Sequence, residues 1–148
     1  MIGIDQQLKA QPMKNKSQNL IFIVDDDPDD RQIILEAFLE NHPTIDYEFI
    51  ETAEDLLLNL NNEESIYPNL ILLDLNMPGV MGLQALKEIR SNKKFSQIPI
   101  VVLTTSTLGK DKTMSYELGA SCFLTKPDSY GKLVDIMNSI IKLWFFEN

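Results

Sequence analysis

The sequence of 148 residues is poor in the side chains that build many active sites, with one cysteine and one histidine. The single cysteine, Cys122, excludes an internal disulfide and any cysteine-rich metal site. Cys122 lies in an apolar run, so we interpret it as a small buried thiol. His42 lies in a polar Glu-Asn-His-Pro stretch, and we interpret it as a solvated helix end rather than a metal ligand. Its isolation also counts against a Ser-His-Asp hydrolase.

Basic residues are also scarce. Lys and Arg total 13 against 22 Asp and Glu, which gives a formal net charge of -9. Binding to nucleic acid without sequence preference depends on basic side chains that neutralise phosphates. An acidic protein is likewise a poor match for an anionic membrane surface. We therefore expect neither nucleic acid nor a membrane as a partner.

Long hydrophobic runs are missing as well. No apolar stretch approaches the ~18 residues needed to cross a bilayer, and the first 19 residues lack the apolar segment of a signal peptide. We expect a cytoplasmic location. Residues 1–19 are polar and aperiodic, which predicts a flexible tail, and residues 20–148 have the length of one domain. No linker to a second domain is recognisable, so we expect no output domain.

What the sequence does contain is an alternation of short apolar runs and amphipathic stretches. Strands are expected at residues 20–24, 47–50, 69–73, 99–103 and 121–124. Helices are expected from residue 28 and at 53–60, 83–90, 110–118 and 130–146. The densest apolar runs are typical of parallel strands buried on both faces.

Local signals support the helix boundaries. Asp27 is expected as a helix N-cap with Pro28 in the first helical position, and Gly119 is expected to close the fourth helix. Five strands alternating with five helices predict an α/β fold. The predicted architecture is a three-layer sandwich around a five-stranded parallel sheet, the flavodoxin-like, doubly wound (βα)5 arrangement.

Polar residues follow the expected strands at the points where the strands end. In open parallel sheets, ligands bind beyond the carboxyl ends of the strands. The residues expected there are Asp25, Asp26, Asp74, Thr104 and Lys126. The capping of strand ends would explain any one of these five residues, but it explains all five together poorly.

Three carboxylates at one edge create an electrostatic problem. Two carboxylates at ~4 Å repel by roughly 4 kcal/mol at an effective dielectric constant near 20, so the cluster must take up protons or bind a cation. Hard oxygen ligands suit Mg²⁺, which keeps several waters and accepts a phosphoryl oxygen. With the cation bound, Asp74 is placed to attack phosphorus as a carboxylate nucleophile, while Lys126 neutralises phosphoryl oxygens.

Four motifs resemble the receiver domains of bacterial two-component systems. They are Val-Asp-Asp at 24–26, Leu-Asp-Leu-Asn-Met-Pro-Gly at 73–79, Val-Leu-Thr-Thr-Ser at 102–106 and Leu-Thr-Lys-Pro at 124–127. Each motif is weak alone, but four in order after the right strands are specific, and the similarity spans residues 20–145. The Leu-Thr-Thr-Ser run and the Leu-Trp-Phe ending further resemble the single-domain regulators that include partners of bacterial phytochromes.

The resemblance implies a role for each site residue. Asp74 would accept a phosphoryl group from the phosphohistidine of a sensor histidine kinase or phosphotransfer protein, in a signalling switch rather than an enzyme with turnover. Asp26, Asp74 and the main-chain carbonyl of Asn76 would bind Mg²⁺ directly. Asp25 would act on the ion through water, and Lys126 would pair with phosphoryl oxygens.

The resemblance also implies how the switch would be read. Thr104 would turn its hydroxyl toward the phosphoryl group, and Phe123 stands at the aromatic position whose rotamer follows. The Lys126–Pro127 peptide, commonly cis in the family, could be cis here. We expect a downstream protein to read the face formed by the fourth helix, the fifth strand and the last helix. The apolar end of the last helix, which includes Trp144, leaves open a homodimer through that helix.

Two other functions fit part of the sequence. Asp25 and Asp27 after the first strand resemble the nucleophile and acid of Mg²⁺ phosphohydrolases of the haloacid-dehalogenase kind. That interpretation leaves Asp74 and its Asn-Met-Pro loop unexplained. A pseudo-receiver that binds partners without phosphate would not need the acidic pair together with Asp74, Thr104 and Lys126.

Overall fold

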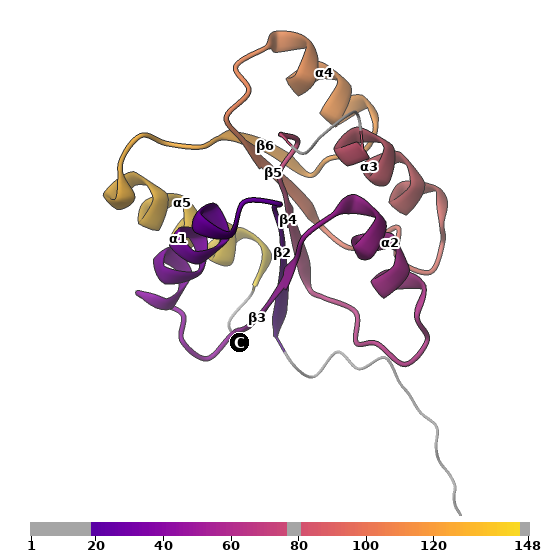
Figure 1. Ribbon diagram of the computed structural model, residues 1–148, viewed down its shortest axis with the longest axis horizontal. Coiled ribbons are helices and arrows are strands. Elements are labelled where there is room, and N and C mark those ends of the chain that lie inside the picture. The colour runs from indigo at the N-terminus through magenta and orange to yellow at the C-terminus, as the bar shows by residue number, and fades with distance from the viewer. Residues whose placement is uncertain (1–18, 77–80, 146–148) are drawn as a thin grey trace, which may run out of the picture.

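The protein folds as a parallel sheet between two layers of helices (Figure 1). This computed structural model describes residues 19–76 and 81–145, apart from the side chain of residue 81, so the tail expected over 1–19 lies almost entirely outside the described residues. The strands are β2 (Leu20–Val24), β3 (Asp46–Ile50), β4 (Leu70–Leu73), β5 (Ile100–Thr104) and β6 (Cys122–Thr125). The helices are α1 (Pro28–Leu39), α2 (Ala53–Asn61), α3 (Met81–Ser91), α4 (Gly109–Glu117) and α5 (Tyr130–Trp144).

The sheet has the strand order β3-β2-β4-β5-β6, and all neighbouring strands are parallel. From β2 the chain first adds β3 on one side and then crosses over to place β4 on the other. The strand order therefore reverses at β2, and a ligand crevice is expected beyond the carboxyl ends of β2 and β4. The predicted flavodoxin-like α/β sandwich is confirmed.

Helices cover both faces of the sheet, with α1 and α5 on one side and α2, α3 and α4 on the other (Figure 1). Alternate residues of β2 enter two separate cores: Ile23 packs with Phe38 and Met137, whereas Phe22 packs with Leu56 and Leu86 on the opposite face. The three central strands are buried on both faces, as their dense apolar runs indicate. This packing holds the strand ends, and the residues that follow them, in place.

The helix boundaries follow the expected local chemistry. The Asp27 carboxylate accepts a hydrogen bond from the Asp29 amide at 2.9 Å, and Pro28 is the first residue of α1. Gly119 has a φ of 109°, the left-handed conformation that favours glycine just after a helix. Within the described parts of the chain, no helix is both long and apolar enough to span a membrane.

Two expectations about single residues are wrong. Cys122 is only partly buried, since β6 is an edge strand. His42 is not simply solvated: its Nε2 lies 2.9 Å from Oδ1 of Asn138 on α5, so the ring joins two helix regions.

Candidate functional site

Three carboxylates meet at the carboxyl edge of the sheet. The Asp25 amide donates to the Ile50 carbonyl at 3.1 Å and the Asp74 amide to the Val24 carbonyl at 3.0 Å, so both residues continue the strand ladders. One oxygen from each of Asp25, Asp26 and Asp74 lies within 4.8 Å of the others. Asp25 is 1% exposed and Asp74 4%, whereas Asp26 is the most open of the three. The structure thus brings together the acids that the sequence placed at separate strand ends.

Each of the two buried acids is oriented by the chain that follows it. Oδ1 of Asp25 accepts from the Asp27 amide, and Oδ1 of Asp74 accepts from the Asn76 amide, both at 2.9 Å. These are Asx turns, which use one carboxylate oxygen to reverse the chain. Gly82 lets α3 approach the second turn closely, because a Cβ there would lie 3.3 Å from the Asp74 carbonyl oxygen. The second oxygen of each acid is left to face the crevice.

Lys126 is the cation of this cluster. Its Nζ lies 2.8 Å from Oδ2 of Asp30, 3.0 Å from Oδ2 of Asp25 and 3.4 Å from Oδ2 of Asp74. Its amide donates to the Thr104 carbonyl at 2.7 Å, which extends the pairing of β5 and β6 to the residue that carries the ammonium group. Lys126 therefore points across the crevice from the edge of the sheet.

Asp30 is the site residue that the sequence analysis missed. An acidic residue in the first turn of a helix complements the positive end of the helix dipole, and this alone would explain Asp30. Its place in the first turn of α1, just after the acidic pair, was the available signal. Whether that turn faces the crevice depends on how α1 packs against the sheet and α5, and the sequence does not show this directly.

Burial and charge act in opposite directions within the cluster. Burial raises the pKa of Asp25, and hydrogen bonds from the Asp27 amide and from Lys126 offset part of that rise. For Lys126, burial lowers the pKa, but the hydrogen bond to Asp30 and attraction from Asp74 and Asp25 outweigh burial and raise it above its ordinary value. Each charged group therefore depends on its neighbours for compensation.

The donor set fits a hard divalent cation. Three carboxylates converge within 4.8 Å, two of them buried, and with Asp30 they outnumber the single ammonium group that faces them. Carboxylate oxygens are the ligands that such ions prefer. The cluster of Asp25, Asp26 and Asp74 could therefore hold a divalent metal ion.

Thr104 and Asn76 connect this cluster to α4. The Thr104 hydroxyl is buried and donates to Oδ1 of Asn76, which also accepts from the Thr105 amide at 3.0 Å. The Ser106 amide donates to the Thr104 hydroxyl at 3.3 Å, and the Ser106 hydroxyl donates to Asp111 of α4 at 2.6 Å. A chain of hydrogen bonds thus runs from the Asp74 turn to the first turn of α4.

Phe123 lies on the edge strand β6. It is partly buried, and its amide donates to the Tyr116 hydroxyl of α4 at 3.0 Å. The peptide between Lys126 and Pro127 is trans, since no cis bond occurs in the described chain, and the expected cis form is not found.

Comparison with known proteins agrees with this geometry. The response regulator receiver domain family matches residues 21–138. Response regulator Rcp1 of Synechocystis sp. is 37% identical over 131 residues, which cover 84% of this chain and 88% of that protein. The chain therefore has a relative of similar length throughout its folded part.

Solved structures show the same fold. The phosphorylated cyanobacterial phytochrome response regulator RcpA superposes with a TM-score of 0.79 at 31% identity, over 86% of this chain and 94% of that one. The Mn²⁺-bound form of Rcp1 gives a TM-score of 0.76 at 35% identity, over 88% of this chain and 96% of that one. With the family match across most of the chain, these likenesses show that the protein belongs to the response regulator receiver domains of two-component signalling systems.

Proposed function

We propose that this protein is a switch in which Asp74 accepts a phosphoryl group with the help of Mg²⁺. Receiver domains of this family take phosphoryl groups from histidine kinases. The observation that carries the assignment to Asp74 is its position: its carboxylate groups with those of Asp25 and Asp26 within 4.8 Å, and its Oδ2 lies 3.4 Å from Nζ of Lys126. The proposed nucleophile thus lies beside both a candidate metal site and the Lys126 ammonium group.

Four residues would hold the ion. Asp26, Asp74 and the main-chain carbonyl of Asn76 would bind Mg²⁺ directly, and Asp25 would bind it through water. A Mn²⁺-bound form of Rcp1 is known, which supports a divalent site in this fold. When bound, the ion would supply positive charge to the acidic cluster and to the phosphoryl oxygens.

The transfer itself needs little from the protein beyond position and charge. A carboxylate oxygen of Asp74 attacks phosphorus, and the bond between phosphorus and the donor's histidine nitrogen breaks. The bonding electron pair stays on that nitrogen, and Asp74 becomes a mixed anhydride. Lys126 then donates to the phosphoryl oxygens. Because the product stays attached until water slowly removes it, the protein acts as a switch rather than as an enzyme with turnover.

Phosphorylation would be read through the chain of hydrogen bonds that starts at Thr104. The phosphoryl group adds about two negative charges and new acceptors. We infer that the Thr104 hydroxyl leaves Asn76 for a phosphoryl oxygen, which loosens the link through Ser106 to Asp111. The start of α4 and the Phe123 side chain would then rearrange, and a downstream protein would read the face of α4, β6 and α5.

The partners follow from the same proposal. The phosphoryl donor would be a sensor histidine kinase or phosphotransfer protein, and the similarity of this chain to the phytochrome response regulator RcpA supports a phytochrome-type kinase. Leu143 is 59% exposed beside a hollow lined by Cys122, Ile136 and Trp144, which supports a homodimer through α5. Sedimentation with and without beryllofluoride tests for the homodimer, and a monomer at every concentration would reject it.

We propose that all of these steps take place in the cytoplasm, as the family indicates.

One experiment tests the main proposal. The chain is incubated with acetyl phosphate and Mg²⁺, and a labile phosphoryl adduct is expected on Asp74 by mass spectrometry. The Asp74→Asn variant serves as the control and should carry no adduct. Equal labelling of that variant would contradict the proposal, hydrolysis of stable phosphate esters through Asp25 would indicate a phosphohydrolase, and no adduct would indicate a pseudo-receiver.

A further inference from the structure

We propose that Asp30 is a positioning residue that holds the Lys126 ammonium group on the α1 side of the site and thereby slows phosphoryl transfer to Asp74. This inference rests on the proposed function, because it concerns the rate at which Asp74 is phosphorylated. Asp30 is not one of the carboxylates that group together for a metal ion. Its effect would therefore reach the reaction through Lys126.

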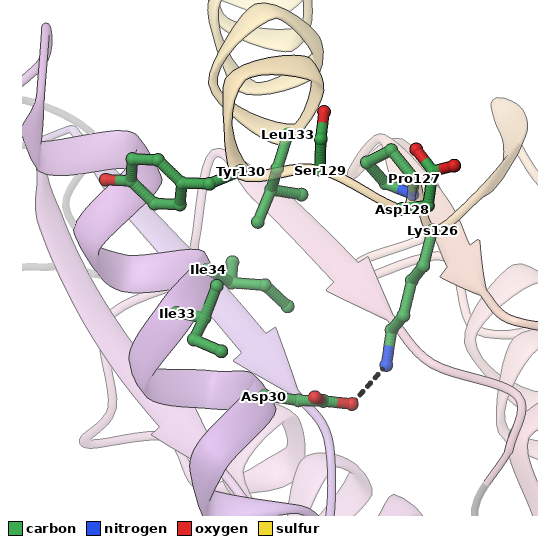
Figure 2. A pocket seen from close by; sticks show the side chains of 9 residues that line it. All are labelled: Asp30, Ile33, Ile34, Lys126, Pro127, Asp128, Ser129, Tyr130 and Leu133. Carbon is green, nitrogen blue, oxygen red and sulfur yellow. Dashed lines mark hydrogen bonds and ion pairs between the residues drawn. The ribbon is translucent and has the colours of Figure 1, made fainter.

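Of the acids around Lys126, Asp30 is the nearest. Its Oδ2 is 2.8 Å from Nζ, against 3.4 Å for Oδ2 of Asp74. Figure 2 shows the Lys126 side chain extended toward the first turn of α1, where the dashed line joins it to Asp30. The ammonium group that is needed at the phosphoryl group thus lies closer to Asp30 than to Asp74, the proposed phosphoryl acceptor.

The ammonium group has no spare donor in this arrangement. It offers three N–H bonds, and Asp25, Asp30 and Asp74 each accept one. A phosphoryl group on Asp74 brings new anionic acceptors, so Lys126 must give up a partner or share a donor. The reaction therefore includes an exchange of partners at Lys126.

Exposure decides which partner is released. Asp25 has a side chain only 2% exposed, and a buried carboxylate without a cation is costly. The Asp30 side chain is 39% exposed, and it lines a hollow of about 310 Å³ between α1 and α5 (Figure 2). Water in that hollow can solvate Asp30 once the ammonium group leaves. Asp30 is thus the one acid that can release Lys126 at small cost.

The test compares three single variants with the unmodified chain at saturating Mg²⁺, with acetyl phosphate as the donor. Because a partly exposed ion pair is weak, Asp30→Asn should raise the maximal rate constant for labelling Asp74 roughly threefold. The donor concentration at half-maximal rate should stay nearly unchanged. Asp30→Glu keeps a carboxylate and should restore the slower rate. Asp29→Asn removes the same charge from an exposed neighbour without a Lys126 contact, and its maximal rate should match that of the unmodified chain.

Two further measurements separate positioning from a general charge effect. In a Lys126→Ala background, Asp30→Asn should no longer change the labelling rate, because the lysine that it restrains is gone. In ¹⁵N NMR spectra of the unphosphorylated protein, the Nζ signal of Lys126 should shift in Asp30→Asn and stay in place in Asp29→Asn.

The outcomes are distinguishable. An unchanged or slower rate in Asp30→Asn, with an unaltered melting temperature, would overturn the inference. An equal gain in Asp29→Asn, or a gain that persists without Lys126, would overturn it too, since both point to net charge alone. If the unmodified chain takes no label at all, the proposed function is rejected, and the NMR comparison still decides whether Asp30 positions Lys126.

Discussion

Lys126 and Arg90 are two partly buried cations at opposite ends of the sheet, and they are held in different ways. Among the residues that the structure describes, Nζ of Lys126 pairs only with carboxylates, those of Asp25, Asp30 and Asp74. The Arg90 guanidinium, at the end of α3, instead donates to neutral oxygens. Its acceptors are the carbonyls of Gly119, Ser96 and Ile98, at 2.8, 3.0 and 2.8 Å, and the Ser121 hydroxyl at 3.4 Å.

The difference separates a structural clamp, made by the hydrogen bonds of Arg90, from a site at Lys126 whose contacts can change. Arg90 joins the end of α3 to the segments that lead into β5 and β6, and its partners are main-chain or hydroxyl groups that do not titrate in the physiological range. Lys126 is surrounded by more negative charge than it can neutralise, so another cation can join it and its own partners can be exchanged. The contacts at the Arg90 end of the sheet therefore stay fixed, whereas those at the Lys126 end can change when charge is added.

The largest expected effect is on the clamp. Arg90→Ala leaves three carbonyl groups without their donor, so we expect the free energy of unfolding to fall by about 3 kcal/mol. Urea denaturation measures it. The Mg²⁺ affinity of the folded variant should match that of the unmodified chain, and a large loss of affinity would mean that the two ends are not independent.

Addition of Mg²⁺ should have the next largest effect on stability, and it acts at the acidic cluster at the carboxyl end of the sheet. An ion that binds only the folded chain stabilises it by about 2.7 kcal/mol at a concentration 100 times its dissociation constant. Melting curves with Mg²⁺ or EDTA measure this gain. Arg90→Ala should keep the gain and Asp26→Ala should lose most of it. The same gain in Asp26→Ala would show that the ion binds elsewhere.

Lys126→Ala should affect transfer more than stability. Loss of the donors to the phosphoryl oxygens should slow labelling of Asp74 about tenfold, since charge-assisted hydrogen bonds contribute on the order of 1.5 kcal/mol or more. With Mg²⁺ present, the melting temperature should fall less than in Arg90→Ala, because the ion compensates the carboxylates. A larger fall than in Arg90→Ala would make Lys126 a structural residue.

The smallest expected effect is a pH dependence confined to the acidic end. Burial raises the pKa of Asp25, so the folded chain holds a proton at a pH where the unfolded chain has lost it. The stability contributed by Asp25 in metal-free protein is therefore fully present below its unfolded value of 3.8 and is lost as the pH rises through the folded pKa. Unfolding measured against pH should show this dependence, and Asp25→Asn should lack it. An identical profile in that variant would assign the titration to another acid.

Much of the acidic cluster at the carboxyl edge of the sheet could be predicted from the sequence, because its features are local. Asp25 and Asp74 each follow a dense apolar run, and a run buried on both faces must end at the edge of a parallel sheet. The Asx turns after both acids involve residues two positions apart. Asp30 is the exception within the site, because it does not follow a strand and its contact with Lys126 depends on how α1 packs against the sheet.

The Arg90 clamp could not be predicted in the same way. Its acceptors lie in two separate loops, and three of them are main-chain carbonyls, which have no signature in the side-chain pattern. The 45% exposure of Ile33 on α1 could not be predicted for a related reason. Apolar spacing on a helix indicates which side is hydrophobic, but the neighbouring helix decides how much of that side is covered.

By itself, the sequence determined the alternation of strands and helices, the parallel sheet and the identity of the acids at its carboxyl edge, because each depends on short-range patterns of burial and chain reversal. Only the tertiary structure decided that Asp30 is the closest partner of Lys126 and that Arg90 holds the opposite end with neutral oxygens. Both depend on distances between segments far apart in sequence, which the packing of helices against the sheet sets.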